Sequence, residues 1–188
     1  MKKILLLVLA LTVSCFAIQA QQDKNPEKQL TKFEEFSSKT GVIVKFVDVS
    51  LPNLPVSYST LQTGIRTIMR GSENAYFYRL EEPETSRSVA HIAMIEYSDL
   101  VEINKAVSRL VADVDADVAA NPDYLENKFK TSDGFEVGYY VSKQKAHWYI
   151  KLERYSSSTV FLKNQQDVVD AFKAAQDKIE ELKRTSGK

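Results

Sequence analysis

The chain has 188 residues, of which 44% are hydrophobic and 27% charged, so it is long enough to bury a core of its own. Its 25 basic and 25 acidic residues cancel at pH 7 and are interspersed along the chain. The absence of a basic block from the sequence argues against a nucleic-acid-binding protein and against a polybasic membrane-surface segment.

The first twenty residues have the three-part plan of a secretory signal peptide. Two lysines precede an apolar stretch over 4–13, and Ala20 is a small residue at a cleavage position. The apolar stretch is shorter than the ~20 residues that a membrane span needs. We therefore expect cleavage after Ala20, a periplasmic or secreted single domain over 21–188, and no transmembrane span after cleavage.

The single cysteine, Cys15, lies inside this leader and leaves an alternative open. In that alternative, Cys15 is the lipid-modified first residue of a lipoprotein, although such leaders usually have Leu where this chain has Thr12. If cleavage follows Ala20, the remaining chain carries 23 basic and 25 acidic residues and no cysteine. Disulfide bonds, a thiol nucleophile and a cysteine metal site are then excluded.

Hydrophobic periodicity and turn residues predict one helix near the start of the chain and a series of short strands. A helix is expected from Pro26 to about Gly41, followed by a buried strand over 42–49. The segment 51–55 is expected to be a connector, because its two prolines exclude a central strand. The further strands are expected near 64–70, 75–82, 89–97, 126–131, 135–141, 147–154 and 159–163.

Two long amphipathic helices complete the pattern. One is expected from Ser98 to about Asn121, and the other over 164–184 with Asn164 as its cap. The side chains expected to be buried, each on the apolar face of its element, are Val44, Phe46, Leu110, Val114, Trp148, Ile150 and Phe172.

The order of the elements predicts an α+β protein, with an antiparallel sheet of about eight strands and the helices packed on one face. Residues 76–81 (YFYRLE) parallel 148–153 (WYIKLE). This suggests an internal repeat, about 26–97 and 98–163, closed by the last helix, although shared strand patterning explains the match equally well. In element order alone, the chain resembles the tandem repeat of the β-lactamase-inhibitor protein fold, and no motif carries that protein's activity across.

The sequence contains few candidates for catalysis or metal binding. Both histidines, His91 and His147, lie in predicted strands, and no glycine-rich phosphate loop, dinucleotide fingerprint or HExxH motif occurs, so we predict no cofactor. Alternating aspartates over 113–117 resemble the start of a calcium loop, but the Gly and Glu that such a loop needs later are missing. A solvated helix face is the expected explanation, and the weak candidates for a cation site are Asp113, Asp117 and Asp123.

A binding surface is suggested by the alternation of side chains along two strands. If Trp148 and Ile150 face the helices, Tyr149 must face away, and the same step in the first half turns Phe77 outward. Aromatic rings beside charges are typical of interaction surfaces, although ordinary cross-strand pairing is the alternative. The predicted partner-binding residues are Phe77, Arg79, Tyr149, Lys151 and Glu153.

These observations favour a non-enzymatic binding domain of the cell envelope, with an envelope or extracellular protein as its partner. The alternative is an exported hydrolase that combines His147 with carboxylates.

Overall fold

The computed structural model describes residues 29–84, 86, 89–154 and 159–186, and it confirms an α+β protein with antiparallel strands. The expected leader, with Cys15 and the cleavage position after Ala20, lies outside the described residues. In chain order the elements are α2 (Lys32–Ser37), β1 (Val44–Pro55), β2 (Thr60–Arg70), β3 (Glu73–Glu82), β4 (His91–Glu96), α3 (Tyr97–Ala119), β5 (Leu125–Lys130), β6 (Glu136–Ser142), β7 (Lys145–Lys151), β8 (Val160–Phe161) and α4 (Gln165–Ser186).

The eight strands form two sheets rather than the single sheet that the sequence predicted. Each sheet has four strands in sequence order, β1-β2-β3-β4 and β5-β6-β7-β8. An isolated bridge between Val56 and Leu162 joins the end of β1 to the end of β8. Beside it, the Ser57 N–H donates to the carbonyl oxygen of Phe161 at 2.8 Å. Among the described residues, this short stretch is where backbone hydrogen bonds join the two sheets.

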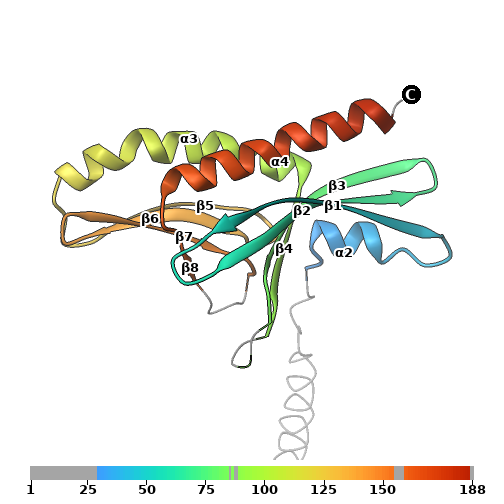
Figure 1. Ribbon diagram of the computed structural model, residues 1–188, viewed down its shortest axis with the longest axis horizontal. Helices are drawn as coiled ribbons and strands as arrows, with labels where there is room; N and C mark the ends of the chain where they lie inside the picture. Colours follow the sequence, from blue (N-terminus) through green and yellow to red (C-terminus); the bar gives the residue numbers. More distant parts are fainter. Residues whose placement is uncertain (1–28, 85, 87–88, 155–158, 187–188) are drawn as a thin grey trace, which may run out of the picture.

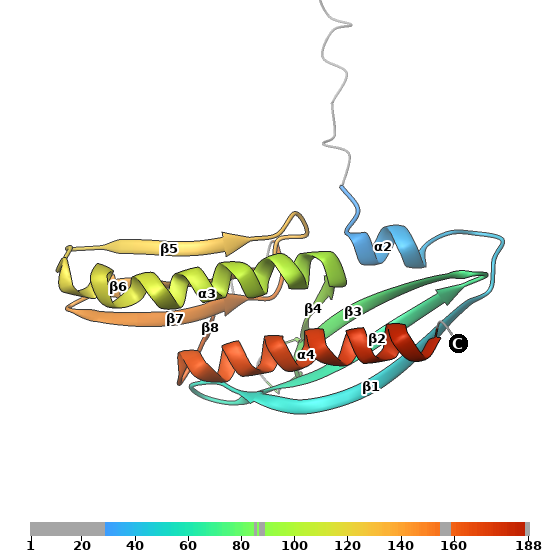
Figure 2. The same cartoon turned by 90° about the horizontal axis from the view of Figure 1, so that it is seen from above.

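The long helices α3 and α4 lie side by side over one face of both sheets, whereas α2 lies against the opposite face of the first sheet (Figures 1 and 2). Two adjacent residues of β3 show the difference. The ring centroids of Tyr78 and Phe172 of α4 lie 5.3 Å apart, and those of Phe77 and Phe33 of α2 lie 5.5 Å apart. The prediction of one shared face is therefore wrong for α2. None of the described helices is long and apolar enough to cross a membrane.

Side-chain caps set the beginnings of two helices. The Thr31 hydroxyl accepts a hydrogen bond from the Glu34 N–H at 3.1 Å, and the Glu34 carboxylate accepts one from the Thr31 N–H at 2.8 Å. This capping box starts α2 later than the sequence predicted. The Asn164 side chain accepts from the Gln166 N–H at 2.9 Å, which agrees with its predicted role as the cap of α4.

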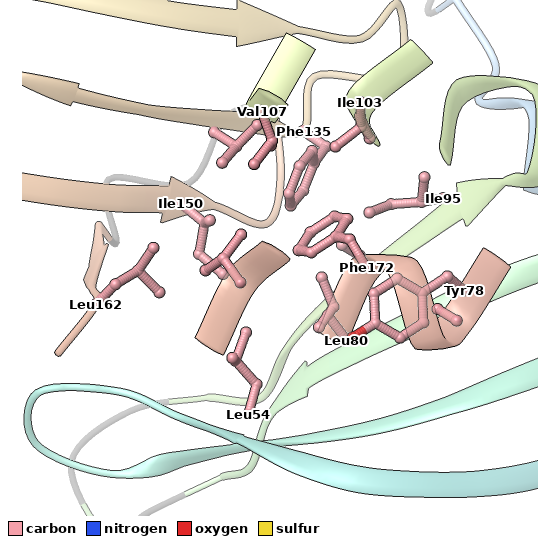
Figure 3. Close-up of a cluster of buried hydrophobic side chains, with 14 of the residues drawn as sticks. Leu54, Tyr78, Leu80, Ile95, Ile103, Val107, Phe135, Ile150, Leu162 and Phe172 are labelled. Atoms are coloured by element: carbon pink, nitrogen blue, oxygen red, sulfur yellow. The ribbon is translucent and has the colours of Figure 1, made fainter. Parts of the chain in front are cut away.

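The core lies between the two long helices and the two sheets (Figure 3). Phe172 of α4 is fully buried and contacts both Tyr78 of the first sheet and Phe135 of the second. Of the seven side chains predicted to be buried, five are buried: Leu110, Val114, Trp148, Ile150 and Phe172.

The prediction is wrong for the two residues of β1. Phe46 is 46% exposed and Val44 is half-buried, because β1 is an edge strand and its outer side is not covered. The same position explains why β1 continues through Pro52 and Pro55, where a connector was expected. An edge strand tolerates proline, and the pairing with β2 shifts register between Leu51 and Leu54.

The two sequence segments that suggested a repeat occupy equivalent places. Residues 76–81 lie in β3, and 148–153 cover the end of β7 and the two residues after it, so each belongs to the third strand of its sheet. In both, the first, third and fifth residues belong to the helix-side core. The two halves thus share a strand order, and an origin by duplication stays a prediction.

Candidate functional site

The predicted binding residues of the first sheet do not form an exposed surface. Phe77 faces away from the long helices, as alternation predicted, but it is only 1% exposed because the Phe33 ring of α2 packs edge-on against it. Arg79 on the same face forms an ion pair with Glu81. The prediction that Phe77 is a solvent-exposed anchor is wrong, because a helix covers that face.

Tyr149 of the second sheet is also buried, at 3% exposed. It lies opposite Gly138 on β6 and Phe161 on β8. Its hydroxyl donates to a carboxylate oxygen of Glu126. Burial, and then this hydrogen bond, raise the pKa of Tyr149 well above its usual value. Tyr149 therefore serves the packing of the sheet, and the prediction that it is an exposed anchor is wrong.

The outer face of the second sheet nevertheless presents other aromatic rings. The Tyr140 ring stacks on His147, with ring centroids 4.8 Å apart, and on Tyr124, with ring centroids 6.1 Å apart. The Phe161 ring packs against Tyr140 in a T-shaped arrangement, with ring centroids 6.4 Å apart. Tyr124 is 63% exposed. His147, the base of the alternative hydrolase, thus lies on this open face, and no carboxylate among the described residues is within ion-pair distance of it.

Lys151, another predicted binding residue, belongs to an ionic cluster around Glu136. The Glu136 side chain is 7% exposed, and its oxygens lie 2.8 Å from Lys130, 3.3 Å from Lys128 and 4.0 Å from Lys151. Burial raises the pKa of Glu136, but the hydrogen bonds from Lys130 and Lys128 outweigh burial and hold this pKa below its ordinary value. The cluster is therefore expected to stabilise the fold at neutral pH.

We expect Glu136→Gln to lower the free energy of unfolding by ~1–3 kcal/mol at pH 7, because it removes charge-assisted hydrogen bonds. A carboxyl whose folded-state pKa is depressed stabilises fully above its unfolded value of ~4.3, and this stabilisation is lost as pH falls through the folded value. In urea unfolding, the free energies of unfolding of the parent and Glu136→Gln should therefore converge as the pH falls below that value.

Glu102→Gln is the control, because Glu102 forms an exposed ion pair with Lys105, and its free energy of unfolding should stay within ~0.5 kcal/mol of the parent's. An unchanged difference between parent and Glu136→Gln at every pH would contradict the assignment.

The candidate cation residues do not come together. Asp117 accepts hydrogen bonds from the Tyr139 hydroxyl at 2.5 Å and from the Asn127 amide at 2.6 Å. Burial, and then the bond to Asp117, raise the pKa of Tyr139 to about 12. Asp113 is exposed on α3, Asp123 is exposed beyond its end, and in the described part of the chain no group of three or more His, Cys, Asp or Glu could hold a metal. The aspartate run is a helix face rather than a calcium loop.

A cavity of about 490 Å³ lies at the seam between the two sheets. This volume is within the range of ~300–1,000 Å³ that is usual for ligand sites. Its lining comes from α2, β4, the turn between β5 and β6, and the end of β7, so it draws on both halves. The apolar side chains in the lining are Phe33, Ile92, Ala93, Met94, Ile95, Phe135 and Leu152.

Charged groups beside this seam cavity link the segments that line it. The Lys32 N–H donates to Asp133 at 3.0 Å, and the Lys32 ammonium lies 2.6 Å from Asp99. Burial raises the pKa of Asp133 despite the hydrogen bond from Lys32. Asp133 reaches this position through a tight turn in which Gly134 has a φ of +96°, and a Cβ there would overlap Arg154.

Glu153, the last predicted binding residue, lies at the seam as well. Its carboxylate accepts a hydrogen bond from the Ile92 N–H of β4 at 3.0 Å and lies 3.5 Å from His91. In an antiparallel strand, residues alternate between those bonded to the neighbour and those pointing away. Because Ile92 donates to Glu153, the backbone groups of Ile92 and Met94 must point away from β3. Met94 therefore offers its N–H and C=O along the free edge of β4, beside the cavity.

Sequence reasoning found Glu153 but missed the rest of the seam. The gap between the expected strands near 126–131 and 135–141 implied a turn there, and nothing local indicated that Asp133 in this turn would contact Lys32 of α2. Comparison with protein-family models, with curated proteins and with solved structures finds no match to this chain.

Proposed function

We propose that the protein is a non-enzymatic binding domain that accepts an extended polypeptide segment along the free edge of β4. The observation that carries this proposal is the coincidence of an open strand edge at Met94 with the apolar seam cavity. Strand addition supplies affinity through backbone hydrogen bonds, and adjacent pockets supply specificity through alternate side chains. The expected leader places this binding in the envelope or outside the cell, with an envelope or extracellular protein as the source of the segment.

The charges around the cavity favour an apolar and basic segment. Four carboxylates and two guanidinium groups line it, from Glu34, Asp99, Asp133, Glu153, Arg66 and Arg154. Arg66 is already held in a bidentate pair with Asp48, and Arg154 donates to the carbonyl oxygen of Ser132. Of the carboxylates, Asp99 is paired with the Lys32 ammonium and Glu34 belongs to the capping box. Asp133 and Glu153 therefore supply the negative charge that Lys or Arg beside an apolar anchor would complement.

The Glu153 carboxylate supports the geometry of strand addition. It accepts the Ile92 N–H in the way that the carbonyl oxygen of a neighbouring strand would. A peptide that continues this line would pair next with Met94. The hydrolase alternative would have to use the same carboxylate and His91, so recovery of a bound peptide in cleaved form would favour it.

The test uses random peptides displayed on phage and selected on the purified chain. We expect enrichment of peptides that combine apolar residues with Lys or Arg, and synthetic copies should bind in titrations followed by fluorescence. Met94→Pro should weaken this binding about tenfold, equivalent to ~1.4 kcal/mol, because it removes the outward N–H. The ladder with β3 does not use that N–H, so the fold should persist in circular dichroism.

Met94→Leu is the matched control, because it keeps the backbone N–H and a similar volume, and its affinity should stay within about threefold of the parent. Equal binding by Met94→Pro and the parent would refute strand addition. Loss of binding only in a Tyr124→Ser, Tyr140→Ser double variant would move the site to the outer aromatic face of the second sheet.

A further inference from the structure

The short helix α2 is held on the protein by few contacts. It has six residues, none of which is buried, and none of them belongs to the core under the long helices. Isolated helices shorter than ~12–15 residues are marginal in water, so α2 depends on its docking contacts. Segments with few buried apolar contacts open locally at a small cost in free energy. α2 can therefore leave the first sheet without unfolding the rest of the protein.

Two aromatic contacts hold α2 on the outer face of the first sheet, and a cavity lies on each side of it. The ring centroids of Phe33 and Phe77 lie 5.5 Å apart, and the Arg70 guanidinium lies 4.3 Å from the centre of the Phe36 ring. Phe33 lines the seam cavity, whereas Phe36 and Phe77 line a second cavity of about 520 Å³. Departure of α2 would therefore join the two cavities into one groove over Phe77.

The pair Lys32-Phe33 at the start of α2 has the chemistry proposed for the bound segment. Phe33 places an apolar ring in the wall of the seam cavity. The Lys32 N–H donates to Asp133 at 3.0 Å, and the Lys32 ammonium lies 2.6 Å from Asp99. Both of these carboxylates line the same cavity. A basic residue beside an apolar anchor therefore already occupies part of the site.

We propose that Lys32-Phe33 is an internal competitor, which docks at the seam in the free protein and is displaced when a segment binds there. This inference rests on the proposed function for the identity of the bound segment. It narrows that segment to one with Lys or Arg followed by an aromatic residue, because such a pair replaces both contacts of α2. Departure of Lys32 also releases Asp99 to the incoming basic side chain.

The effect of the competitor on affinity has a definite sign. A tethered segment has an effective concentration in the millimolar range, so weak contacts are enough to keep it docked. The apparent dissociation constant of an external segment is its intrinsic value divided by the fraction of protein in which the site is open. Removing the docking contacts of α2 should therefore tighten binding. If Phe33 were only a wall of the cavity, its removal would weaken binding.

The test uses a synthetic peptide with the sequence of residues 29–38, titrated into the purified chain and followed by NMR. We expect the double variant Lys32→Ala, Phe33→Ala to bind this peptide at least about tenfold more tightly than the parent, whose site is already occupied. Glu35→Ala is the matched control and should bind like the parent, because Glu35 is exposed on α2 and makes neither contact. A peptide with the same two alanines should bind neither chain. Equal or weaker binding by the double variant would overturn the proposal.

Amide hydrogen exchange of the parent, without any peptide, tests the opening of α2 directly. The amides of Glu35 and Ser38 donate to the carbonyl oxygens of Thr31 and Glu34. We expect them to exchange at least ~100-fold faster than the amide of Tyr78 in β3, because α2 opens while the sheet stays folded. Exchange of all three at one rate would overturn the proposal, since α2 would then open only when the whole protein unfolds.

Circular dichroism shows whether the double variant is folded. If it is not, Lys32→Ala alone keeps the Phe33 contact and should still bind the peptide at least about threefold more tightly than the parent. The outcome is also separable from strand addition. Peptide binding that Met94→Pro leaves unchanged in the double variant would refute strand addition and would leave the internal competitor supported.

Discussion

Phe172→Ala is expected to lower the free energy of unfolding by ~3–5 kcal/mol, the usual loss when a buried aromatic ring is truncated. Phe172 is fully buried on α4, with Tyr78 at 5.3 Å on one side and Phe135 at 5.8 Å on the other. Its ring therefore joins the core of the first sheet to that of the second (Figure 3). Removing it leaves a cavity between β3 and the residue before β6, which belong to different sheets and cannot easily move inward together.

Urea unfolding followed by circular dichroism measures this loss. Phe161→Ala is the matched control, because it makes the same chemical change at a ring that is 37% exposed, and the loss there should be below about 1 kcal/mol. Separate unfolding transitions of the two halves in Phe172→Ala would extend the result, since the ring is a link between them. A loss below about 1 kcal/mol at Phe172 would contradict the packing described for α4.

Gly138→Ala is expected to cost ~1–3 kcal/mol or more, although it adds a single methyl group. A Cβ at Gly138 would overlap the backbone carbonyl of Asn127 and would lie 2.7 Å from the Lys128 Cα. Both atoms belong to the backbone of β5, so no side chain can turn aside to make room. The methyl group must push β5 away from β6 and weaken their pairing.

Ser142→Ala serves as the control for Gly138→Ala, because Ser142 is on the same strand and the same face but is half-buried. Thermal unfolding should show a clear decrease for Gly138→Ala and a small change for the control. Amide hydrogen exchange should locate the weakening in β5 and β6 rather than in the first sheet. Equal stability of the two variants would show that the strands separate easily at this position.

Local periodicity predicted the two long helices and their buried sides. Leu110 and Val114 lie four residues apart on α3, Phe172 lies on the apolar side of α4, and all three are buried. Alternation also placed Phe77 and Tyr149 on the faces away from the long helices. It could not predict that both rings are buried, since the cover comes from Phe33 of α2 in one case and from neighbouring strands in the other.

The position of a strand within a sheet could not be predicted from local sequence either. The run over 42–49 is apolar enough to suggest a central strand, but β1 is an edge strand with Phe46 exposed. A central strand has two neighbouring strands and an edge strand has one, and the local residue pattern does not show which of these applies. The seam cavity cannot be predicted from local sequence for the same reason, because Asp133, Met94 and Glu153 come from three separate parts of the chain.

The sequence by itself determined the element order, the α+β class and which side of each long helix is buried, because hydrophobic spacing acts within one helix or strand. The tertiary structure alone decided the division into two sheets, the covering of Phe77 by α2, the seam cavity and the open edge of β1. Each of these depends on which distant segments come into contact. Such contacts are set by the summed packing of the whole chain, so no single stretch of residues specifies them.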